Sequence, residues 1–189
     1  LITYLKQEHI TVKGYEEIYR DVEALEGGSV LLEKAVVNYR ICHSLKQGIK
    51  VVDAANPTID MKAVKNPVEL ANTVQAHIKD GVAVTKFMYW LKNRIGKEEI
   101  TEISASDYLE ELRRQQEHFL DVSFDTISAY GPNGAMMHYK ATEESNAVLK
   151  AEGFLLVDSG GHYLEGTTDI TRTFALGALS RQQKEYFTA

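Results

Sequence analysis

Residues 154–174, FLLVDSGGHYLEGTTDITRTF, place one aspartate directly after an apolar segment and a second aspartate near the start of a segment rich in β-branched residues. Residues 154–157 are typical of a buried strand, and Asp158 follows them directly. Residues 168–174 are rich in β-branched side chains and predict a second strand. The glycines between these segments indicate turns. The stretch therefore predicts a hairpin-like pair of strands with an acidic residue near each.

The two aspartates form the first candidate site. Side chains alternate faces along a strand, so Asp169, Thr171 and Thr173 share one face. If the strands pair, Asp158 and Asp169 lie on one face, where two carboxylates repel each other unless a cation lies between them. Oxygen ligands suit a divalent ion, so the pair predicts a metal site. Two simpler interpretations stay open: an Asx-type turn at Asp158, and hydrogen bonds from neighbouring threonines to Asp169.

Composition limits the class of protein. The 189 residues are 44% hydrophobic and carry a net charge of -6, which is ordinary for a soluble globular chain of one or two domains. The acidic balance argues against a nucleic-acid partner. No apolar run is long enough to cross a membrane, and residues 1–10, LITYLKQEHI, lack the charged start and apolar core of a signal peptide. The single cysteine, Cys42, excludes an internal disulfide, so nothing indicates an oxidising compartment and we expect a cytoplasmic location. Cys42 itself is interpreted as a packed thiol.

The first part of the chain alternates between helix and strand signals. We expect helices at 15–25 and 35–45 and strands at 29–32 and 49–52, which together form an α/β layer. No group of residues here indicates chemistry. Asn56-Pro57 is the best boundary signal, because the residue before proline avoids helical geometry. We therefore expect one domain to end at residue 55 and another to begin at residue 56.

A long helix is expected next. Asn66, Pro67 and Glu69 form an N-terminal capping signature, and apolar residues then recur at helical spacing until Gly96. Gly81 predicts a kink or close packing within this helix. A second helix is expected over residues 108–116, with a weaker capping signature from Ser104 and Asp107.

A second candidate site lies in residues 124–139. Residues 127–130 predict a strand, 131–134 a turn, and 136–138 an extended piece that places His138 near a strand end. Beside a metal site, this histidine would donate a hydrogen bond to a carbonyl oxygen or move a proton, because imidazole side chains in general gain and lose a proton near neutral pH. The alternative is a structural histidine at the end of a strand.

Three motifs resemble one family. VDSGGHYLEGTTDITRTF is similar to the signature of the pita-bread metallopeptidases, and in particular of the aminopeptidase P (Xaa-Pro aminopeptidase) family. FDTIS followed by GPNGAMMHY resembles the cytosolic branch, and PTIDMKAVKNPVELANTVQAHIKDGVAVTKFMYWL resembles the start of the catalytic domain. The resemblance implies an α+β chain. Residues 1–55 would end an upstream α/β, creatinase N-terminal-like domain, and residues 56–189 would form the first part of an incomplete pita-bread (creatinase/aminopeptidase-like) catalytic domain.

The resemblance also implies a mechanism for the intact protein. Asp158 would hold one of two divalent ions, manganese being the expected metal, Asp169 would bridge both ions, and His138 would assist catalysis. The substrate would be a peptide with proline in second position, with no nucleic acid or membrane as partner. A homodimer is compatible with the sequence.

Only part of the family's ligand set is matched. The remaining histidine and two glutamates of the family's site belong to a later half of the domain, and His162 and Glu165 do not take those roles. We therefore expect a piece of a longer protein that binds metal weakly and is inactive by itself. A prolidase or another aminopeptidase of the same fold, and a non-catalytic peptide-binding homologue, are the alternatives.

Overall fold

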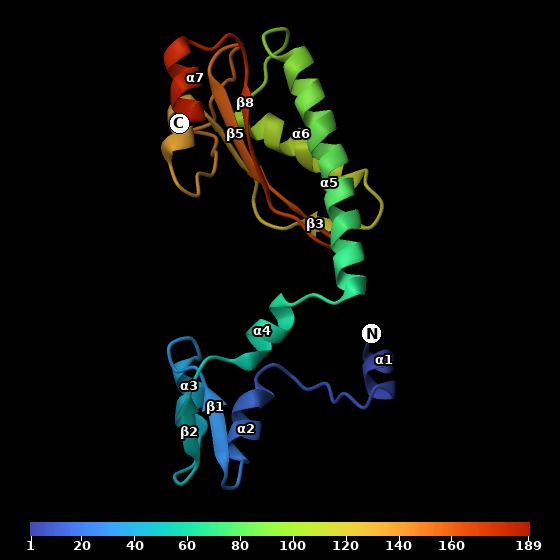
Figure 1. Ribbon diagram of the computed structural model, residues 1–189, viewed down its shortest axis with the longest axis vertical. Coiled ribbons are helices and arrows are strands. Elements are labelled where there is room, and N and C mark those ends of the chain that lie inside the picture. The colour runs from blue at the N-terminus through green and yellow to red at the C-terminus, as the bar shows by residue number, and fades with distance from the viewer. The chain divides into compact units, whose positions relative to one another are not determined.

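The computed structural model describes residues 1–189 as two compact units, Leu1–Lys65 and Asn66–Ala189 (Figure 1). The mixture of helices and strands confirms the α+β class. The elements of the first unit are α1 (Ile2–Gln7), α2 (Glu17–Glu23), β1 (Ser29–Leu32), α3 (Tyr39–Ser44), β2 (Lys50–Asp53) and α4 (Pro57–Ala63). The domain boundary was predicted between residues 55 and 56, whereas the two units meet between Lys65 and Asn66. Only α4 lies between these two positions, and the predicted domain boundary stays a prediction.

The first unit contains the expected strand, helix and strand. β1 and β2 pair in parallel and α3 joins them, which is the usual way to connect parallel neighbours. The helix predicted at 35–45 is shorter than expected. The Asn38 side chain accepts a hydrogen bond from the Ile41 N–H at 3.0 Å and so starts α3 at the next residue. Cys42 is partly buried and unpaired by any disulfide.

The second unit contains two helices, two small sheets and a terminal helix. Its elements are α5 (Pro67–Arg94), α6 (Glu102–Arg114), β3 (Phe119–Val122), β4 (Ile127–Tyr130), the 3-10 helix η1 (Gly131–Ala135), β5 (Phe154–Ser159), β6 (Gly161–Tyr163), β7 (Gly166–Thr167), β8 (Ile170–Ala175) and α7 (Arg181–Thr188). The sheets have the orders β4-β5-β8 and β3-β6-β7, and all their pairs are antiparallel. No helix is both long and apolar enough to span a membrane.

The long helix α5 begins as predicted. Asn66 accepts hydrogen bonds from two backbone N–H groups of the first turn, and Glu69 accepts from the Asn66 N–H at 2.9 Å, which completes a capping box. Gly81 does not mark close packing, since a Cβ there would meet nothing within 4 Å. The buried stripe of α5 contains a charged residue among apolar ones: Ala76, Asp80, Ala83, Phe87 and Leu91.

Helix α6 starts earlier than predicted. Thr101, rather than Ser104, is the N-cap residue, and it accepts a hydrogen bond from the Ser104 N–H at 3.1 Å. Ser104 donates back to the Thr101 carbonyl and accepts from its N–H, so it is the partner of the cap. The start of α6 therefore includes Glu102, whose side chain is fully buried.

The core of the second unit lies between the sheet β4-β5-β8 and the helices α5 and α6 (Figure 1). Phe87 of α5 meets Phe174 of β8 edge to face, with 5.7 Å between the ring centroids. Leu155 and Val157 of β5 belong to this core. Because side chains alternate, Asp158 lies on the other face of β5.

Candidate functional site

Asp158 lies within a strand ladder. β5 continues to Ser159, one residue beyond Asp158, and Asp158 pairs with Thr171 of β8 and with Ile127 of β4. The Thr171 hydroxyl donates a hydrogen bond to the Asp158 carboxylate at 2.8 Å. The interpretation of Asp158 as a turn residue is therefore wrong. A threonine does donate to a carboxylate here, but the acceptor is Asp158.

Asp169 lies at the end of the same ladder. β8 begins at Ile170, two residues later than predicted, and Asp169 directly precedes it with an exposed side chain. Ile170 pairs with Ser159, so the register makes Asp169 a diagonal neighbour of Asp158. Diagonal positions across an antiparallel pair lie about 7–8 Å apart. The register thus places the two aspartates at one end of the β5-β8 ladder.

A tight crossing fixes this end of the ladder. The strands do not close in a short hairpin, because β6 and β7 lie between β5 and β8. The chain instead leaves β5 through Gly160 and returns through Thr168, which is 1% exposed. The Gly161 N–H donates to the Thr168 hydroxyl at 2.9 Å. A Cβ on Gly160 would lie 2.0 Å from the Thr168 carbonyl oxygen, so only glycine fits. The crossing therefore joins the segment that follows Asp158 to Thr168, the residue directly before Asp169.

A buried ion pair supports the crossing from the helix side. Arg113 of α6 donates to Asp80 of α5 at 2.7 and 3.0 Å, and both side chains are 0% exposed. Arg113 also donates to the Ser159 hydroxyl at 3.1 Å, and the Tyr163 hydroxyl donates to Asp80 at 2.9 Å. Burial, followed by the charge of Asp80, raises the pKa of Tyr163. These contacts attach the residue after Asp158 to both helices.

This ion pair was not predicted from the sequence, where Gly81 was interpreted as a kink or a place of close packing and its neighbour Asp80 was given no role. A usable signal was present, because Asp80 falls at helical spacing on the stripe that contains Ala76, Ala83 and Phe87. A carboxylate on a buried stripe requires a partner, which predicts a buried cation on a neighbouring element.

His138 lies in a turn and not in an extended piece. Residues 131–135 form η1, and His138 follows with a φ of 54°, in the left-handed region. Met136 is extended, but residues 137 and 138 form a further turn, so the prediction of an extended piece over residues 136–138 is wrong at His138. The side chain of His138 is exposed. Its position depends on this loop and not on the ladder that relates the two aspartates.

The other acidic and histidine residues of the stretch are bound elsewhere. His162 contacts the Thr167 hydroxyl at 2.8 Å. Glu165 accepts from Lys79 and from His118, each at 2.6 Å, and these hydrogen bonds, that of Lys79 first, lower the pKa of Glu165 to about 2. No three His, Cys, Asp or Glu residues are grouped so that they could hold a metal ion. The carboxylate oxygens of Asp158 and Asp169 are of the kind that suits a hard divalent ion, and these two residues stay candidate ligands.

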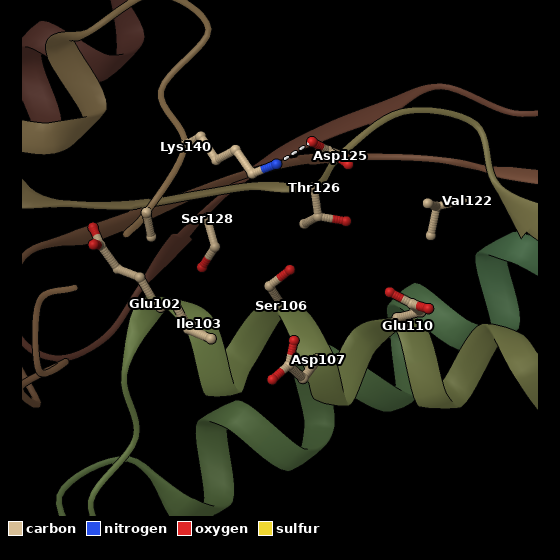
Figure 2. Close-up of a pocket in the computed structure, with 11 residues that line it drawn as sticks. Glu102, Ile103, Ser106, Asp107, Glu110, Val122, Asp125, Thr126, Ser128 and Lys140 are labelled. Carbon is tan, nitrogen blue, oxygen red and sulfur yellow. Dashed lines mark hydrogen bonds and ion pairs between the residues drawn. The ribbon is translucent and has the colours of Figure 1, made fainter. Parts of the chain in front are cut away.

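A separate pocket lies on the helix side of the sheet (Figure 2). It has a volume of about 210 Å³ between α6 and β4, and Ser106, Asp107 and Ser128 are among its lining residues. Ser128 pairs with Val157, whose side chain belongs to the core, so the pocket opens on the face opposite Asp158. The Ser128 hydroxyl is buried without a hydrogen-bond partner. This pocket is therefore distinct from the aspartate pair.

Solved structures share the fold of this chain. The X-prolyl aminopeptidase of Caenorhabditis elegans, described as a cytosolic enzyme with a di-nuclear active site, is 28% identical with a TM-score of 0.81, over 95% of this chain and 31% of that one. The Xaa-Pro dipeptidase of Bacillus anthracis is 23% identical with a TM-score of 0.73, over 98% of this chain and 53% of that one, and supports the fold alone. The fold is the predicted pita-bread type of aminopeptidases and prolidases.

Family comparisons agree with the fold. The model of metallopeptidase family M24 matches residues 71–189, and that of the creatinase/prolidase N-terminal domain matches residues 1–69. The chain therefore belongs to metallopeptidase family M24. A probable Xaa-Pro aminopeptidase P of Aspergillus flavus is 38% identical over 96% of this chain and 29% of its own length. The chain spans roughly a third of the length of such curated relatives. These findings confirm the predicted resemblance.

Proposed function

We propose that the full-length protein is a dinuclear Xaa-Pro aminopeptidase, which hydrolyses the bond between an N-terminal residue and a following proline. The observation that carries the proposal is the placement of Asp158 and Asp169 at one end of the β5-β8 ladder, in a chain 38% identical to probable Xaa-Pro aminopeptidases. The alternative roles of prolidase and of non-catalytic homologue are outcomes of the test below.

The residues of this chain have separate roles in the proposed reaction. Asp158 would be a ligand of one divalent ion and Asp169 a ligand of both, and the other protein ligands would lie outside residues 1–189. Two divalent ions, when bound, polarise a peptide carbonyl and lower the pKa of the attacking water. His138 donates a hydrogen bond to the carbonyl oxygen as negative charge develops there. With two protein ligands, residues 1–189 alone bind metal weakly and are inactive.

The test uses the full-length protein with Mn²⁺. We expect cleavage of Xaa-Pro-Xaa tripeptides with little cleavage of Xaa-Pro dipeptides, and loss of both Mn²⁺ binding by calorimetry and cleavage in Asp158→Asn and in Asp169→Asn. Asp121→Asn removes an exposed carboxylate from β3 and is the matched control. A preference for dipeptides would instead indicate a prolidase. Peptide binding without cleavage would indicate a non-catalytic homologue.

Substrate and location are part of the same proposal. A tertiary amide without an N–H distinguishes proline from other residues in second position, so replacing that proline by alanine should abolish cleavage. A cytosolic location is proposed by analogy with the Caenorhabditis elegans enzyme. Fractionation of the source cells checks it, and recovery of the protein outside the cytosol would contradict it.

A further inference from the structure

Glu102 connects both ends of the loop that carries His138. It is the first residue of α6 and its side chain is 0% exposed. Its carboxylate accepts hydrogen bonds from the Tyr130 N–H at 2.6 Å, the Asn133 amide at 3.0 and 3.2 Å, the Tyr139 hydroxyl at 2.7 Å and the Ala147 N–H at 3.0 Å. Figure 2 shows its side chain at the start of α6. One side chain thus contacts four points of the segment from residue 130 to residue 147.

Hydrogen bonds, and not an ion pair, stabilise the buried carboxylate of Glu102. A buried carboxylate is unfavourable unless its charge is satisfied. Four donating groups and the positive end of the α6 dipole satisfy it here, and the Glu102 N–H donates to the Ala147 carbonyl at 3.0 Å. An apolar residue would fill the same space without fixing the direction of the loop. The hydrogen-bonded carboxylate therefore specifies one loop conformation.

The loop needs such a constraint at His138. A non-glycine residue with a positive φ is strained and persists only where its surroundings fix it. The next residue, Tyr139, is 7% exposed and bonds Glu102, whereas His138 is exposed. At the other end of the loop, Tyr130 ends the strand β4, whose first residue, Ile127, pairs with Asp158. Glu102 therefore connects the turn of His138 to the strands that carry Asp158.

We propose that Glu102 is a positioning residue, which sets the place of His138 relative to Asp158 and thereby the rate of peptide hydrolysis, without contacting substrate. The expected effect of Glu102 on the rate of peptide hydrolysis rests on the proposed function. Its structural part, control of the loop by Glu102, is independent of activity.

The first test is Glu102→Gln in the full-length protein. Glutamine keeps the shape of the glutamate side chain but replaces one carboxylate oxygen by an NH₂ group, which cannot accept a hydrogen bond. Depending on which oxygen is replaced, the N–H of Tyr130 or of Ala147 loses its acceptor. We expect faster hydrogen exchange in residues 131–147 and a kcat lowered about 100-fold, the effect of a misplacement of about 1 Å, with KM little changed. Glu111→Gln, an exposed residue of the same helix, is the control and should change neither. Unchanged exchange in Glu102→Gln would overturn the proposal.

A double-mutant cycle with His138→Ala separates positioning from general destabilisation. If Glu102 acts through His138, Glu102→Gln should lower kcat less than about twofold further in the His138→Ala background. An equal loss in both backgrounds would show that Glu102 acts elsewhere and would overturn the proposal. If the wild-type protein cleaves no Xaa-Pro peptide, the proposed function fails, and the exchange measurement alone decides on Glu102.

Tyr139→Phe serves if Glu102→Gln does not fold. This variant removes only the hydroxyl that donates to Glu102 and contacts Ser145. We expect the same changes in smaller degree, with faster exchange around His138 and a lower kcat. Unchanged exchange and unchanged kcat in this variant would overturn the proposal.

Discussion

Arg113 is a single buried side chain on which much of the stability of the second unit is expected to depend. Its guanidinium is fully buried with Asp80 and also bonds Ser159, beside the candidate metal ligand Asp158. Arg113→Met leaves the carboxylate of Asp80 without a cation, and we expect the free energy of unfolding to fall by about 3–5 kcal/mol in urea denaturation. Arg114→Met, which removes the neighbouring exposed arginine, should change it little.

The double variant Arg113→Met/Asp80→Leu tests the same explanation. Removing both charges leaves no unpaired ion in the core, so the double variant should be more stable than Arg113→Met. A double variant less stable than the single one would show that the hydrogen bonds to Ser159 and Tyr163 dominate, and would contradict the ion-pair account.

Glu165 gives the protein a pH dependence with a defined sign. Hydrogen bonds from Lys79 and His118 lower its pKa from 4.5 to about 2. A carboxylate with a lowered pKa stabilises the fold fully above its unfolded pKa, and this contribution is lost as the pH falls toward the folded pKa. The difference in unfolding free energy between wild type and Glu165→Gln should thus shrink from pH 4.5 to 2. Denaturation across this range measures it, with Glu111→Gln as control for the loss of one charge. A difference that grows on acidification would contradict the assignment.

At the scale of elements, local signals succeeded where the hydrogen bonds are local. The strands β1 and β4 have the bounds that were predicted, and the capping box of Asn66 forms because all its atoms lie within one turn. The start of α6 was misplaced because Thr101 and Ser104 are both residue types that cap helices. Thr101 is the N-cap and Ser104 is its partner in the capping box. The residue types alone do not tell which of the two is the N-cap.

The candidate site was predictable only in part for the same reason. The pairing of β5 with β8 follows from alternation, so the neighbourhood of Asp158 and Asp169 was accessible from sequence. The crossing at Gly160 and Thr168 was not, because it depends on contacts among segments that are distant in sequence, including Ser123. His138 was misplaced because its turn is held by Glu102, 36 positions earlier in the printed sequence.

Gly160→Ala tests the role of the crossing. The new Cβ would lie 2.0 Å from the Thr168 carbonyl oxygen, so the two segments must separate and Asp169 must move relative to Asp158. We expect a loss of about 1–3 kcal/mol in unfolding free energy, as for overpacking, and weaker Mn²⁺ binding by calorimetry.

Gly81→Ala is the matched control for this substitution. It adds the same methyl group in open space within α5, where alanine should stabilise the helix by about 0.5–1 kcal/mol. Mn²⁺ binding should be unchanged in this control. Equal Mn²⁺ affinity in Gly160→Ala and Gly81→Ala would show that the crossing does not set the spacing of the two aspartates.

At the scale of the whole molecule, the two units differ in how much they bury. Residues 1–65 contain no fully buried side chain, whereas the second unit has a continuous core that includes Phe87, Leu91 and Leu155. Burial of apolar surface is the main source of stability. We therefore expect β1 and β2 to exchange their amide hydrogens through low-energy local opening, and α5 and β5 to exchange much more slowly.

Two matched variants, one in each unit, test by hydrogen exchange whether the two units open independently of each other. Leu91→Ala removes a fully buried side chain, so it should cost about 2–5 kcal/mol and accelerate exchange across α5, α6 and β5 while leaving β1 and β2 unchanged. Val51→Ala, in β2, should accelerate exchange only within residues 1–65. If Leu91→Ala accelerated exchange in β1 and β2 to the same degree, the chain would unfold as one cooperative unit. The stability of β5 and β8, beside which the candidate metal ligands lie, would then depend on the first unit as well as on their own core.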